Sequence, residues 1–412
     1  MKRRTPATAR LIVVANRLPV QKVRRGGKSL WESSAGGLVT ALDPVLRSTG
    51  GAWVGWNGTA GRAPRTFSHR ELSIRPIGLS QHEVEHFYHG FSNRTLWPLY
   101  HDAIRTPDFE RKWWRPYVEV NQRFANFVAR IAHPRDLVWV HDYHLQLVPA
   151  MLRALRPTLR IGFFLHIPFP PEELFEWLPW RTQILQGMLG ADVVGFQTHV
   201  AAQNFSRLAR EYTSARGTDA ELNYQRRDIR VASYPIAIDT KWFEAVAGES
   251  ETLRRAADIR RRVGPGRKIL LAVDRLDYTK GIDHRLIAFE ELLKRRRLSV
   301  DDCVLMQIAV PSREAVEDYV HMRERTEQIV GRINGQHSSP GRVAVHYFRR
   351  NLTREELVAY YRAADVMLVT PLRDGMNLVA KEFVATRTDN SGVLVLSEFA
   401  GAAREFRRAL LV

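Results

Sequence analysis

Short apolar runs alternate with amphipathic stretches along almost the whole chain. The runs are rich in β-branched and aromatic residues, as buried strands are, whereas stretches such as residues 38–46, 211–216 and 288–297 carry apolar residues at helical spacing. Strands and helices that alternate in this way are typical of a parallel sheet covered by helices. We predict strands at residues 11–16, 136–142, 160–166, 192–198, 268–274, 303–310, 342–348 and 365–371.

The chain is long enough for two domains, because one hydrophobic core rarely supports 412 residues. A strand-like run ends near residues 234–240, with strand–helix units on both sides. We therefore predict an α/β protein with an N-terminal domain of residues 1–235 and a C-terminal domain of residues 236–412. A capping-box pattern from Thr353 to Glu356 predicts one helix start in the second domain.

Composition excludes several classes of protein. With 45% apolar and 26% charged residues, the chain resembles an ordinary globular protein. Its single cysteine, Cys303, excludes an intramolecular disulfide and a cysteine-rich zinc site, and suits a reducing cytoplasm. The apolar run from Leu11 to Ala15 is shorter than a signal-peptide core, and no run approaches the ~20 residues of a membrane helix. We expect a cytoplasmic protein without a membrane partner.

The formal net charge of +18 first suggests a nucleic-acid partner. However, only nine of the 62 basic residues are lysine, and the arginines are scattered along the chain. This bias is more typical of codon usage in a GC-rich genome than of a binding stripe. We expect no nucleic-acid partner, although an anionic small substrate would be attracted by the same positive field.

Unusual polar clusters directly follow many of the predicted strands. Ligands of open α/β sheets bind at the carboxyl ends of the strands, so this placement favours an enzyme. The clusters are Asn16-Arg17, residues 141–144, His166, residues 274–280, Arg313 and residues 373–377.

The run of residues 365–383 predicts a buried strand, a glycine loop and a helix that opens near Asn377. Backbone N–H groups at a helix start bind anions, and Gly375 allows a ligand to approach closely. Glu382 lies four residues beyond Leu378 on the same helix face, where it can accept hydrogen bonds from a ribose diol. The alternative is a loop pair of Arg373 and Asp374 that caps the helix.

Two cations, Arg275 and Lys280, lie five residues apart in a loop after a predicted strand. A diphosphate fits between them, and fixed cationic donors stabilise the charge on a departing nucleoside diphosphate. The rarity of lysine in this chain strengthens the argument for Lys280. The alternative is a surface salt bridge to Asp274 or Asp277.

Weaker signals lie in the N-terminal half. Asn16-Arg17 ends a strand, and the Gly36-Gly37 pair opens a helix, as at a phosphate-handling edge. Asp142 and His166 each close an apolar run, where a side chain can reach sugar hydroxyls; the alternative for His166 is a structural histidine.

His82, Glu83 and His86 match the H-E-x-x-H pattern of zinc peptidases, but the extended form with glycine and a third histidine is missing. The chain also contains no D-x-D sequence, so a metal-bridged diphosphate is not indicated. We expect no metal site and no cofactor.

Together these runs resemble the trehalose-6-phosphate synthase family of retaining glycosyltransferases, from about Leu11 to the last residue. The resemblance implies the GT-B fold, in which two Rossmann-like domains face each other across a cleft. It also implies transfer of glucose from a nucleoside-diphosphate glucose to glucose 6-phosphate, giving trehalose 6-phosphate. The segments that carry it are NRLPV, SAGGL, GWNG, FYHGFSNRTLWP, WVHDYHL, GFFLHIPFP, GFQT, RLDYTKG, PSR, GRINGQ, TPLRDGMNLVAKE and LSEFAGA.

The resemblance also implies residue roles. The N-terminal domain would hold mainly the acceptor, and the C-terminal domain the donor. The implied acceptor contacts are Arg17 and Arg313 on the phosphate, with Tyr88, Trp97, Trp56 and Asp142. The implied donor contacts are His166 and Asp374 on glucose, Gly37, Arg275 and Lys280 on the diphosphate, and Gly375, Met376, Asn377, Leu378 and Glu382 around the helix start. The candidate catalytic residues among them are Asp142, His166, Arg275, Lys280 and Asp374.

The implied mechanism proceeds on one face of the sugar without a covalent intermediate, because no carboxylate pair like that of a retaining glycosidase is found. The leaving phosphate takes the acceptor proton, while Arg275 and Lys280 replace a metal. Two alternatives remain: a sister transferase that acts on glycerol 3-phosphate or an aminocyclitol phosphate, and a non-catalytic regulatory relative. The donor base is open among UDP, GDP and ADP, and a homo-oligomer is compatible with the sequence.

Departures from the family pattern are few. Asp274 and Thr279 stand where Glu and Ser are common, and the family continues for some dozens of residues beyond Val412. We therefore expect this form to be truncated and its apolar end, residues 409–412, to be a core strand.

Overall fold

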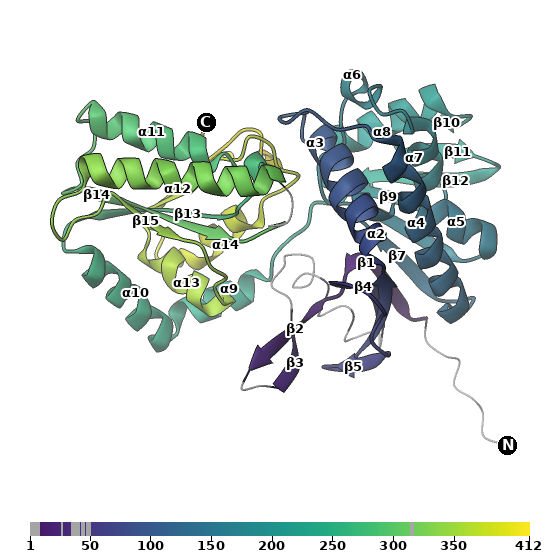
Figure 1. Cartoon of the computed structure of the whole chain (residues 1–412), viewed down its shortest axis with the longest axis horizontal. Helices are drawn as coiled ribbons and strands as arrows, with labels where there is room; N and C mark the ends of the chain where they lie inside the picture. The colour runs from purple at the N-terminus through teal and green to yellow at the C-terminus, as the bar shows by residue number, and fades with distance from the viewer. Residues whose placement is uncertain (1–8, 26–27, 34–41, 43–45, 47–50, 314–316) are drawn as a thin grey trace. The chain divides into compact units, whose positions relative to one another are not determined.

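The computed structural model describes residues 9–25, 28–33, 42, 46, 51–313 and 317–412. The chain divides into two compact units, Met1–Ile236 and Ala237–Val412, so the division lies one residue from the predicted one. Each unit has its own sheet, largely parallel in the first unit and parallel in the second, with covering helices, purple to teal in the first unit and green to yellow in the second (Figure 1). No helix in the described part of the chain is long and apolar enough to cross a bilayer.

The first unit is built on a ten-stranded sheet whose central strands are parallel and whose edges are antiparallel. Its central strand β1 (Leu11–Arg17) is almost fully buried between β7 and β4, which explains its uninterrupted apolar run. In spatial order the strands are β10 (Arg216–Gly217), β11 (Glu221–Tyr224), β12 (Arg227–Ser233), β9 (Val193–Phe196), β8 (Arg160–Leu165), β7 (Leu137–His141), β1, β4 (Ala52–Ala60), β6 (Leu72–Leu79) and β5 (Phe67–His69).

Helices connect the strands of this unit, and a separate antiparallel hairpin pairs β2 (Val20–Arg25) with β3 (Lys28–Ser33). Helices α4, α5, α7 and α8 pack against one another in sequence order. The helices are α2 (Gln81–Glu83), which continues into the π-helix η1 (Val84–Leu96), α3 (Trp97–Tyr100), α4 (Arg111–Ile131), η2 (Tyr143–Leu145), α5 (Val148–Leu155), α6 (Glu172–Phe175), α7 (Arg181–Met188) and α8 (His199–Tyr212).

The second unit is built on a six-stranded sheet in which all pairs are parallel. Its strand order is β15 (Val345–Phe348), β14 (Cys303–Val310), β13 (Lys268–Arg275), β16 (Val366–Val369), β17 (Val393–Leu396) and β18 (Leu410–Leu411).

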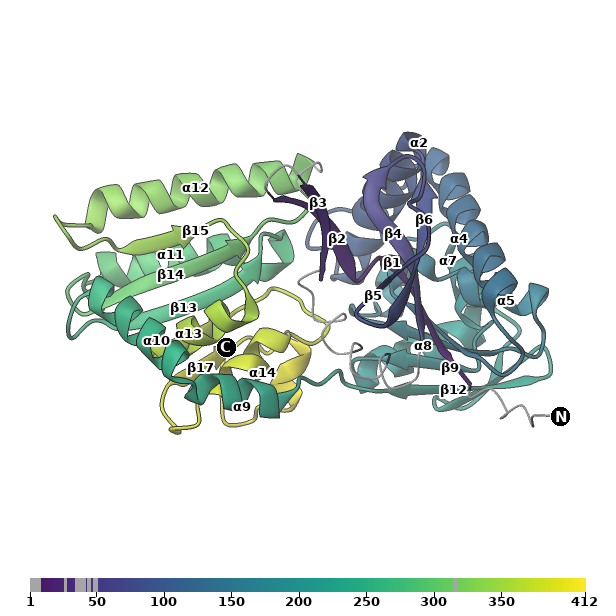
Figure 2. The same ribbon diagram turned by 90° about the horizontal axis from the view of Figure 1, so that it is seen from below.

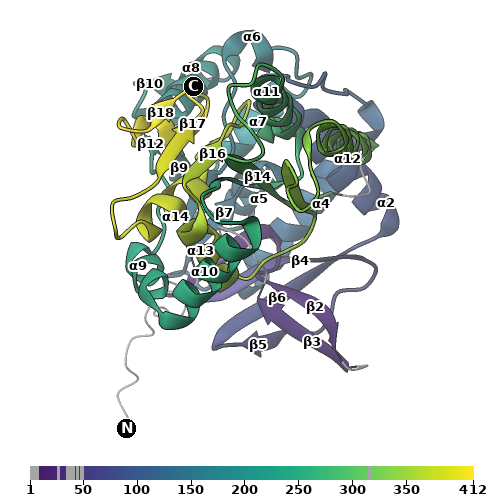
Figure 3. The same ribbon diagram turned by 90° about the vertical axis from the view of Figure 1, so that its left-hand side faces the viewer.

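Two layers of helices enclose this second sheet (Figures 2 and 3). Helices α11 (Ile282–Lys294) and α12 (Glu317–His337) pack together on one face. On the other face lie α9 (Thr240–Gly248), α10 (Ser250–Val263), α13 (Arg354–Ala363) and α14 (Leu378–Thr386). Two short helical turns, η3 (Tyr278–Lys280) and η4 (Gly401–Arg404), lie in loops.

All eight predicted strands are confirmed, and so is the capping box, in which Thr353 and Glu356 bond to each other's backbone N–H groups. The helix predicted at residues 288–297 overlaps the end of α11, whereas most of the one predicted at 38–46 lies outside the described residues.

Two local predictions were wrong. The helix predicted at residues 211–216 ends at Tyr212, because the Thr213 hydroxyl accepts a hydrogen bond from the Ala215 N–H at 3.1 Å in an extended backbone. Residues 409–412 do contain a strand, β18, but it is an edge strand in which Leu410 is 59% exposed rather than a core strand.

Candidate active site

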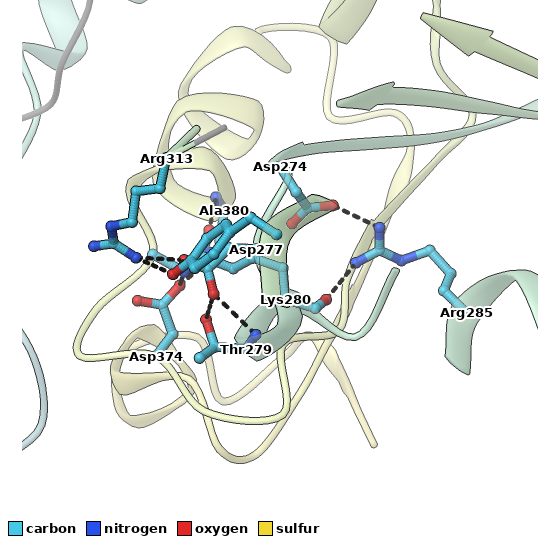
Figure 4. Close-up of polar contacts among 10 residues, drawn as sticks. Asp274, Asp277, Thr279, Lys280, Arg285, Arg313, Asp374 and Ala380 are labelled. Atoms are coloured by element: carbon cyan, nitrogen blue, oxygen red, sulfur yellow. Dashed lines mark hydrogen bonds and ion pairs between the residues drawn. The ribbon is translucent and has the colours of Figure 1, made fainter. Parts of the chain in front are cut away.

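In the second unit, Lys280 and Asp374 form a nearly buried ion pair. The Lys280 Nζ lies close to the Asp374 Oδ2 (Figure 4), at 2.6 Å, and the two side chains are only 9% and 15% exposed. Lys280 ends the turn that follows β13, and Asp374 lies in the loop that follows β16. The alternative of a surface bridge from Lys280 to Asp274 or Asp277 is therefore wrong. Two of the predicted donor contacts are brought together at the carboxyl ends of neighbouring strands.

Close approach of the two loops requires a glycine at position 281. Gly281 has a φ of +61°, and a Cβ there would lie 2.7 Å from the Thr370 carbonyl oxygen. The Leu372 N–H then donates to the Thr279 carbonyl oxygen at 2.8 Å. The loop that carries Lys280 is thus joined by its backbone to the loop that carries Asp374.

Helix α14 begins after Asn377, where the sequence predicts it, and Asn377 caps it. Its Oδ1 accepts from the Ala380 N–H at 3.1 Å, while its Nδ2 donates to the Asp374 Oδ2 at 3.0 Å. The cap is therefore Asn377, not the Arg373–Asp374 pair. The short loop from Asp374 to Asn377 is fixed by a hydrogen bond of 2.8 Å from the Ala402 N–H to the Met376 carbonyl oxygen.

Glu382 lies on α14 one turn beyond Leu378, and it is held from α13. The Tyr361 hydroxyl donates to the Glu382 Oε2 at 2.8 Å, and burial raises the pKa of the Glu382 carboxyl. The ribose contact implied for Glu382 stays a prediction.

A second ion pair, between Arg285 and Asp274, is buried beside the loop that carries Lys280, and the sequence did not reveal it. The Arg285 guanidinium on α11 lies 2.6 Å from the Asp274 Oδ2, and both side chains are at most 3% exposed. Arg285 also donates to the Gln307 Oε1 at 2.8 Å and to the Thr370 hydroxyl at 2.9 Å. The only sequence signal was an arginine among the apolar positions of a helix.

A third carboxylate near this loop, Asp277, interacts with both Arg275 and Arg313, although the sequence suggests it only as an alternative salt-bridge partner of the loop cations. The Arg313 Nη1 lies 2.9 Å from the Asp277 Oδ2. Arg275 ends β13 with an exposed side chain, and its charge acts on the Asp277 carboxylate. The second unit therefore gathers three predicted site cations, Arg275, Lys280 and Arg313, around one loop.

In the first unit, His166 and Asp142 are brought together after β8 and β7. The Asp142 Oδ1 accepts from the His166 N–H at 3.2 Å, and Asp142 has a strained φ of +74°. The His166 Nε2 lies 3.0 Å from the Nδ1 of His141, which is fully buried.

Gln197 defines the tautomer of this histidine pair. Its Oε1 accepts from the Ile236 N–H at 3.0 Å, so its Nε2 faces the His166 Nδ1 at 3.4 Å. His166 therefore accepts at Nδ1 and donates from Nε2 to the Nδ1 of His141. Burial lowers the pKa of His166 to about 4 and that of His141 well below its ordinary value, so the pair is neutral. A purely structural histidine would make the same hydrogen bonds, so the contact of His166 with the donor glucose stays a prediction.

We expect this neutral histidine pair to make the protein less stable in mild acid. The unfolded chain binds protons on both histidines below pH 6.5, whereas the folded chain excludes a proton from His166 until about pH 4. Its contribution, on the order of 3 kcal/mol, is fully present above pH 6.5 and is lost as the pH falls toward 4. Urea unfolding between pH 4 and 8 measures this slope.

The matched variants are His141→Asn and His284→Asn. The first should flatten the pH dependence of the unfolding free energy, whereas the second, at an exposed histidine of α11, should leave it unchanged. Equal slopes in both variants would contradict the assignment of this pH dependence to the buried pair.

Three of the predicted acceptor contacts lie side by side in the first unit. The Arg17 Cζ lies 4.8 Å from the centre of the Trp56 ring, and the Tyr88 ring is 5.3 Å from that of Trp56. Gly58, with a φ of +91°, makes room for Arg17, because a Cβ there would lie 2.3 Å from the guanidinium. An arginine held over an aromatic face in this way is suited to bind a phosphate.

Trp97 is farther along the same aromatic row. Tyr88 stacks on His144 at 5.8 Å, His144 contacts Tyr143 at 3.9 Å, and Tyr143 contacts Trp97 at 5.6 Å between ring centres. Trp97 is only 2% exposed, so it offers a ligand little surface. Arg313 belongs to the second unit, and Gly37 lies outside the described residues.

The H-E-x-x-H segment has a structural explanation. Glu83 forms a capping box with Ser80 and pairs with Arg123, while His82 stacks on His86 at 4.1 Å. Within the described ranges, no group of three or more His, Cys, Asp or Glu side chains is placed to hold a metal.

Comparisons with known proteins identify the family and the fold of the chain. The model of Glycosyltransferase family 20 matches residues 9–412. A trehalose-6-phosphate synthase of Mycolicibacterium smegmatis is 52% identical over 98% of this chain and 82% of its own length. An α,α-trehalose-phosphate synthase (UDP-forming) from Burkholderia vietnamiensis has a TM-score of 0.89 and 38% identity over 98% of this chain and 88% of its own.

The corresponding enzyme from Burkholderia xenovorans, solved in complex with glucose 6-phosphate, has a TM-score of 0.89 and 34% identity, with the same coverage of 98% and 88%. These likenesses, with two α/β units whose sheets have parallel central strands, confirm the predicted GT-B fold class. The chain therefore belongs to glycosyltransferase family 20.

Proposed function

We propose that this enzyme transfers glucose from a nucleoside-diphosphate glucose to glucose 6-phosphate with retention, giving trehalose 6-phosphate. The observation that carries the proposal is the Lys280–Asp374 pair of 2.6 Å at the carboxyl ends of β13 and β16. This pair joins Lys280, the proposed diphosphate contact, to Asp374, the proposed contact of the donor glucose. The relatives named above as trehalose-phosphate synthases support the same reaction.

We further propose UDP-glucose as the donor, because one of these relatives is named as UDP-forming. The N-terminal unit would hold mainly the acceptor through Arg17, Trp56, Tyr88 and Asp142, and the C-terminal unit the donor. A cytoplasmic location fits this substrate pair and the single buried cysteine, Cys303.

The protein's part in the reaction is to position charge. Arg275 and Lys280 stabilise the diphosphate as the glycosidic bond to it breaks, and Asp374 orients Lys280 through their ion pair. The leaving phosphate oxygen takes the proton of the acceptor hydroxyl on the same face of the sugar. No protein carboxylate forms a covalent intermediate in this scheme.

A single coupled assay tests the proposal. The enzyme is supplied with UDP-, GDP- or ADP-glucose together with glucose 6-phosphate, glycerol 3-phosphate or an aminocyclitol phosphate, and the released nucleoside diphosphate and the sugar product are measured. We expect trehalose 6-phosphate with UDP-glucose, also in excess EDTA, because fixed cations occupy the role of a metal. Turnover only with another acceptor would favour the sister transferase, and no turnover would favour a regulatory relative.

Arg17→Ala should weaken the recognition of the acceptor phosphate. Hydrogen bonds to charged groups contribute roughly 1.5–3 kcal/mol, so the KM for glucose 6-phosphate should rise about tenfold or more while the KM for the donor stays unchanged. The preference for glucose 6-phosphate over glucose should narrow by a similar factor. Arg62→Ala, at an exposed arginine of the same unit, serves as the control. An unchanged preference in Arg17→Ala would place the phosphate elsewhere.

A further inference from the structure

Arg313 is held by Asp277, which lies in the RLDYTKG segment, and by Tyr319, which no motif identified. The Arg313 Nη1 donates to the Asp277 Oδ2 at 2.9 Å and also bonds to the Tyr319 hydroxyl. The Tyr319 hydroxyl in turn donates to the same Asp277 oxygen at 2.9 Å. The three side chains thus form a closed triangle of hydrogen bonds, with Arg313 beside Asp277 in Figure 4.

The triangle joins three separate segments of the second unit. Asp277 lies in the loop between β13 and α11, Arg313 follows β14, and Tyr319 is in the first turn of α12. Because each segment follows or precedes a packed element, the position of Arg313 is determined by the sheet and by α12 together.

Burial restricts Arg313 further. Its side chain is 7% exposed, that of Asp277 is 0% exposed, and Tyr319 is 2% exposed. An arginine usually loses much side-chain entropy when it binds a ligand. Here that freedom is already lost in the folded protein, so less is lost on binding.

The backbone of Arg313 is also unusual, because its φ of +46° lies in the left-handed region. A residue with a Cβ is disfavoured there, and such a conformation persists only where surrounding contacts impose it. The bonds to Asp277 and Tyr319 are contacts of this kind. The strain therefore supports a specific placement of this guanidinium.

Asp277 is itself firmly anchored. Its Oδ1 accepts from the Thr279 N–H at 3.0 Å and from the Thr279 hydroxyl at 2.9 Å, so both carboxylate oxygens have partners. Burial alone would raise the pKa of Asp277, but Arg313, Arg275 and Lys280 outweigh it and lower the pKa to about 2. The carboxylate is therefore charged at every pH at which the enzyme would work.

We propose that Asp277 and Tyr319 are positioning residues which hold Arg313 in place for the phosphate of the acceptor, and so determine the preference for a phosphorylated over an unphosphorylated sugar. This inference rests on the proposed function and on the acceptor contact that the family resemblance implies for Arg313, namely with that phosphate. Neither positioning residue needs to touch the substrate.

Tyr319→Phe is the sharpest test, because it removes one hydroxyl and keeps the ring. We expect the KM for glucose 6-phosphate to rise about tenfold, with kcat and the KM for UDP-glucose nearly unchanged. The ratio of kcat/KM for glucose 6-phosphate to that for glucose should fall by the same factor. In an Arg313→Ala background, Tyr319→Phe should have no further effect on this ratio, since it acts through Arg313.

Two further variants complete the design. Asp277→Asn keeps the shape but removes the charge, and should lower the same ratio at least as much. Tyr347→Phe is the matched control in the same unit, because the Tyr347 hydroxyl is buried and has no hydrogen-bond partner among the residues that the structure describes. It should leave the ratio unchanged.

The outcomes separate the inference from the function on which it rests. If the unmodified enzyme forms no trehalose 6-phosphate, the proposed function itself fails. If it does, but Tyr319→Phe only lowers the melting temperature and leaves the acceptor ratio intact, the inference is overturned. The inference would also be overturned if Tyr319→Phe lowered the acceptor ratio by the same factor in the Arg313→Ala background as in the unmodified enzyme.

Discussion

Replacing Lys280 by alanine is expected to lower kcat about 100-fold or more while the fold survives. Loss of one preorganised donor that stabilises charge in the transition state typically costs about 2.7–4 kcal/mol. Lys280 is well placed for this role because Asp374 and the joined loops hold its ammonium group in one position. Steady-state kinetics with saturating donor and acceptor measure the effect, and Arg275→Ala should have an effect of similar size.

Lys241→Ala provides the control, since Lys241 is an exposed lysine on α9 in the same unit. Thermal melting of all variants separates a loss of chemistry from a loss of folded protein. Near-normal turnover in both Lys280→Ala and Arg275→Ala would show that the diphosphate does not lie between these cations.

The largest effect on stability is expected for Arg285→Met. This change leaves the Asp274 carboxylate, 2% exposed, without its cation in the interior of the second unit. Removal of one partner of a buried ion pair typically lowers the free energy of unfolding by about 3–5 kcal/mol. Urea unfolding measures the loss, and hydrogen exchange of β13 and α11 should locate it in this unit.

The double variant Arg285→Met/Asp274→Leu is the informative companion. Because it removes both charges, it should recover much of the stability that Arg285→Met loses. Arg295→Met is the matched control, since Arg295, just after α11, pairs with the exposed Glu291 of that helix, and an exposed pair contributes only about 0–1 kcal/mol. A loss in Arg285→Met no larger than in this control would contradict the assigned importance of the buried pair.

The central strands of the two sheets were mostly predictable because most central strands of a parallel sheet are buried on both faces. Each then appears as a continuous apolar run, as in β1 and β14. The strands β4 and β6 were missed, because glycine, proline and polar residues interrupt their runs. They lie toward the edge of the first sheet, where fewer positions are buried and the apolar signal weakens.

Much of the candidate site was also visible in the sequence, as polar residues directly after strands. This works because parallel strands place all their carboxyl ends at one edge of the sheet. Lys280, Asp374 and Asn377 were named on that basis, and the structure brings them together. The start of helix α14 at Asn377 was predictable too, because asparagine is a favoured N-cap residue before an apolar helix.

The partners of these residues were not predictable. Lys280 meets Asp374 across 94 residues of chain, not the nearby Asp274 or Asp277, because β16 lies beside β13 in the sheet. Arg285 and Tyr319 were missed because a buried polar residue can be recognised only from the residue to which it bonds, and that partner is distant in the sequence. Hydrogen bonds and ion pairs act over a few ångströms, so spacing along the chain reveals which residue types are available, whereas the packing of strands and helices determines which of them meet.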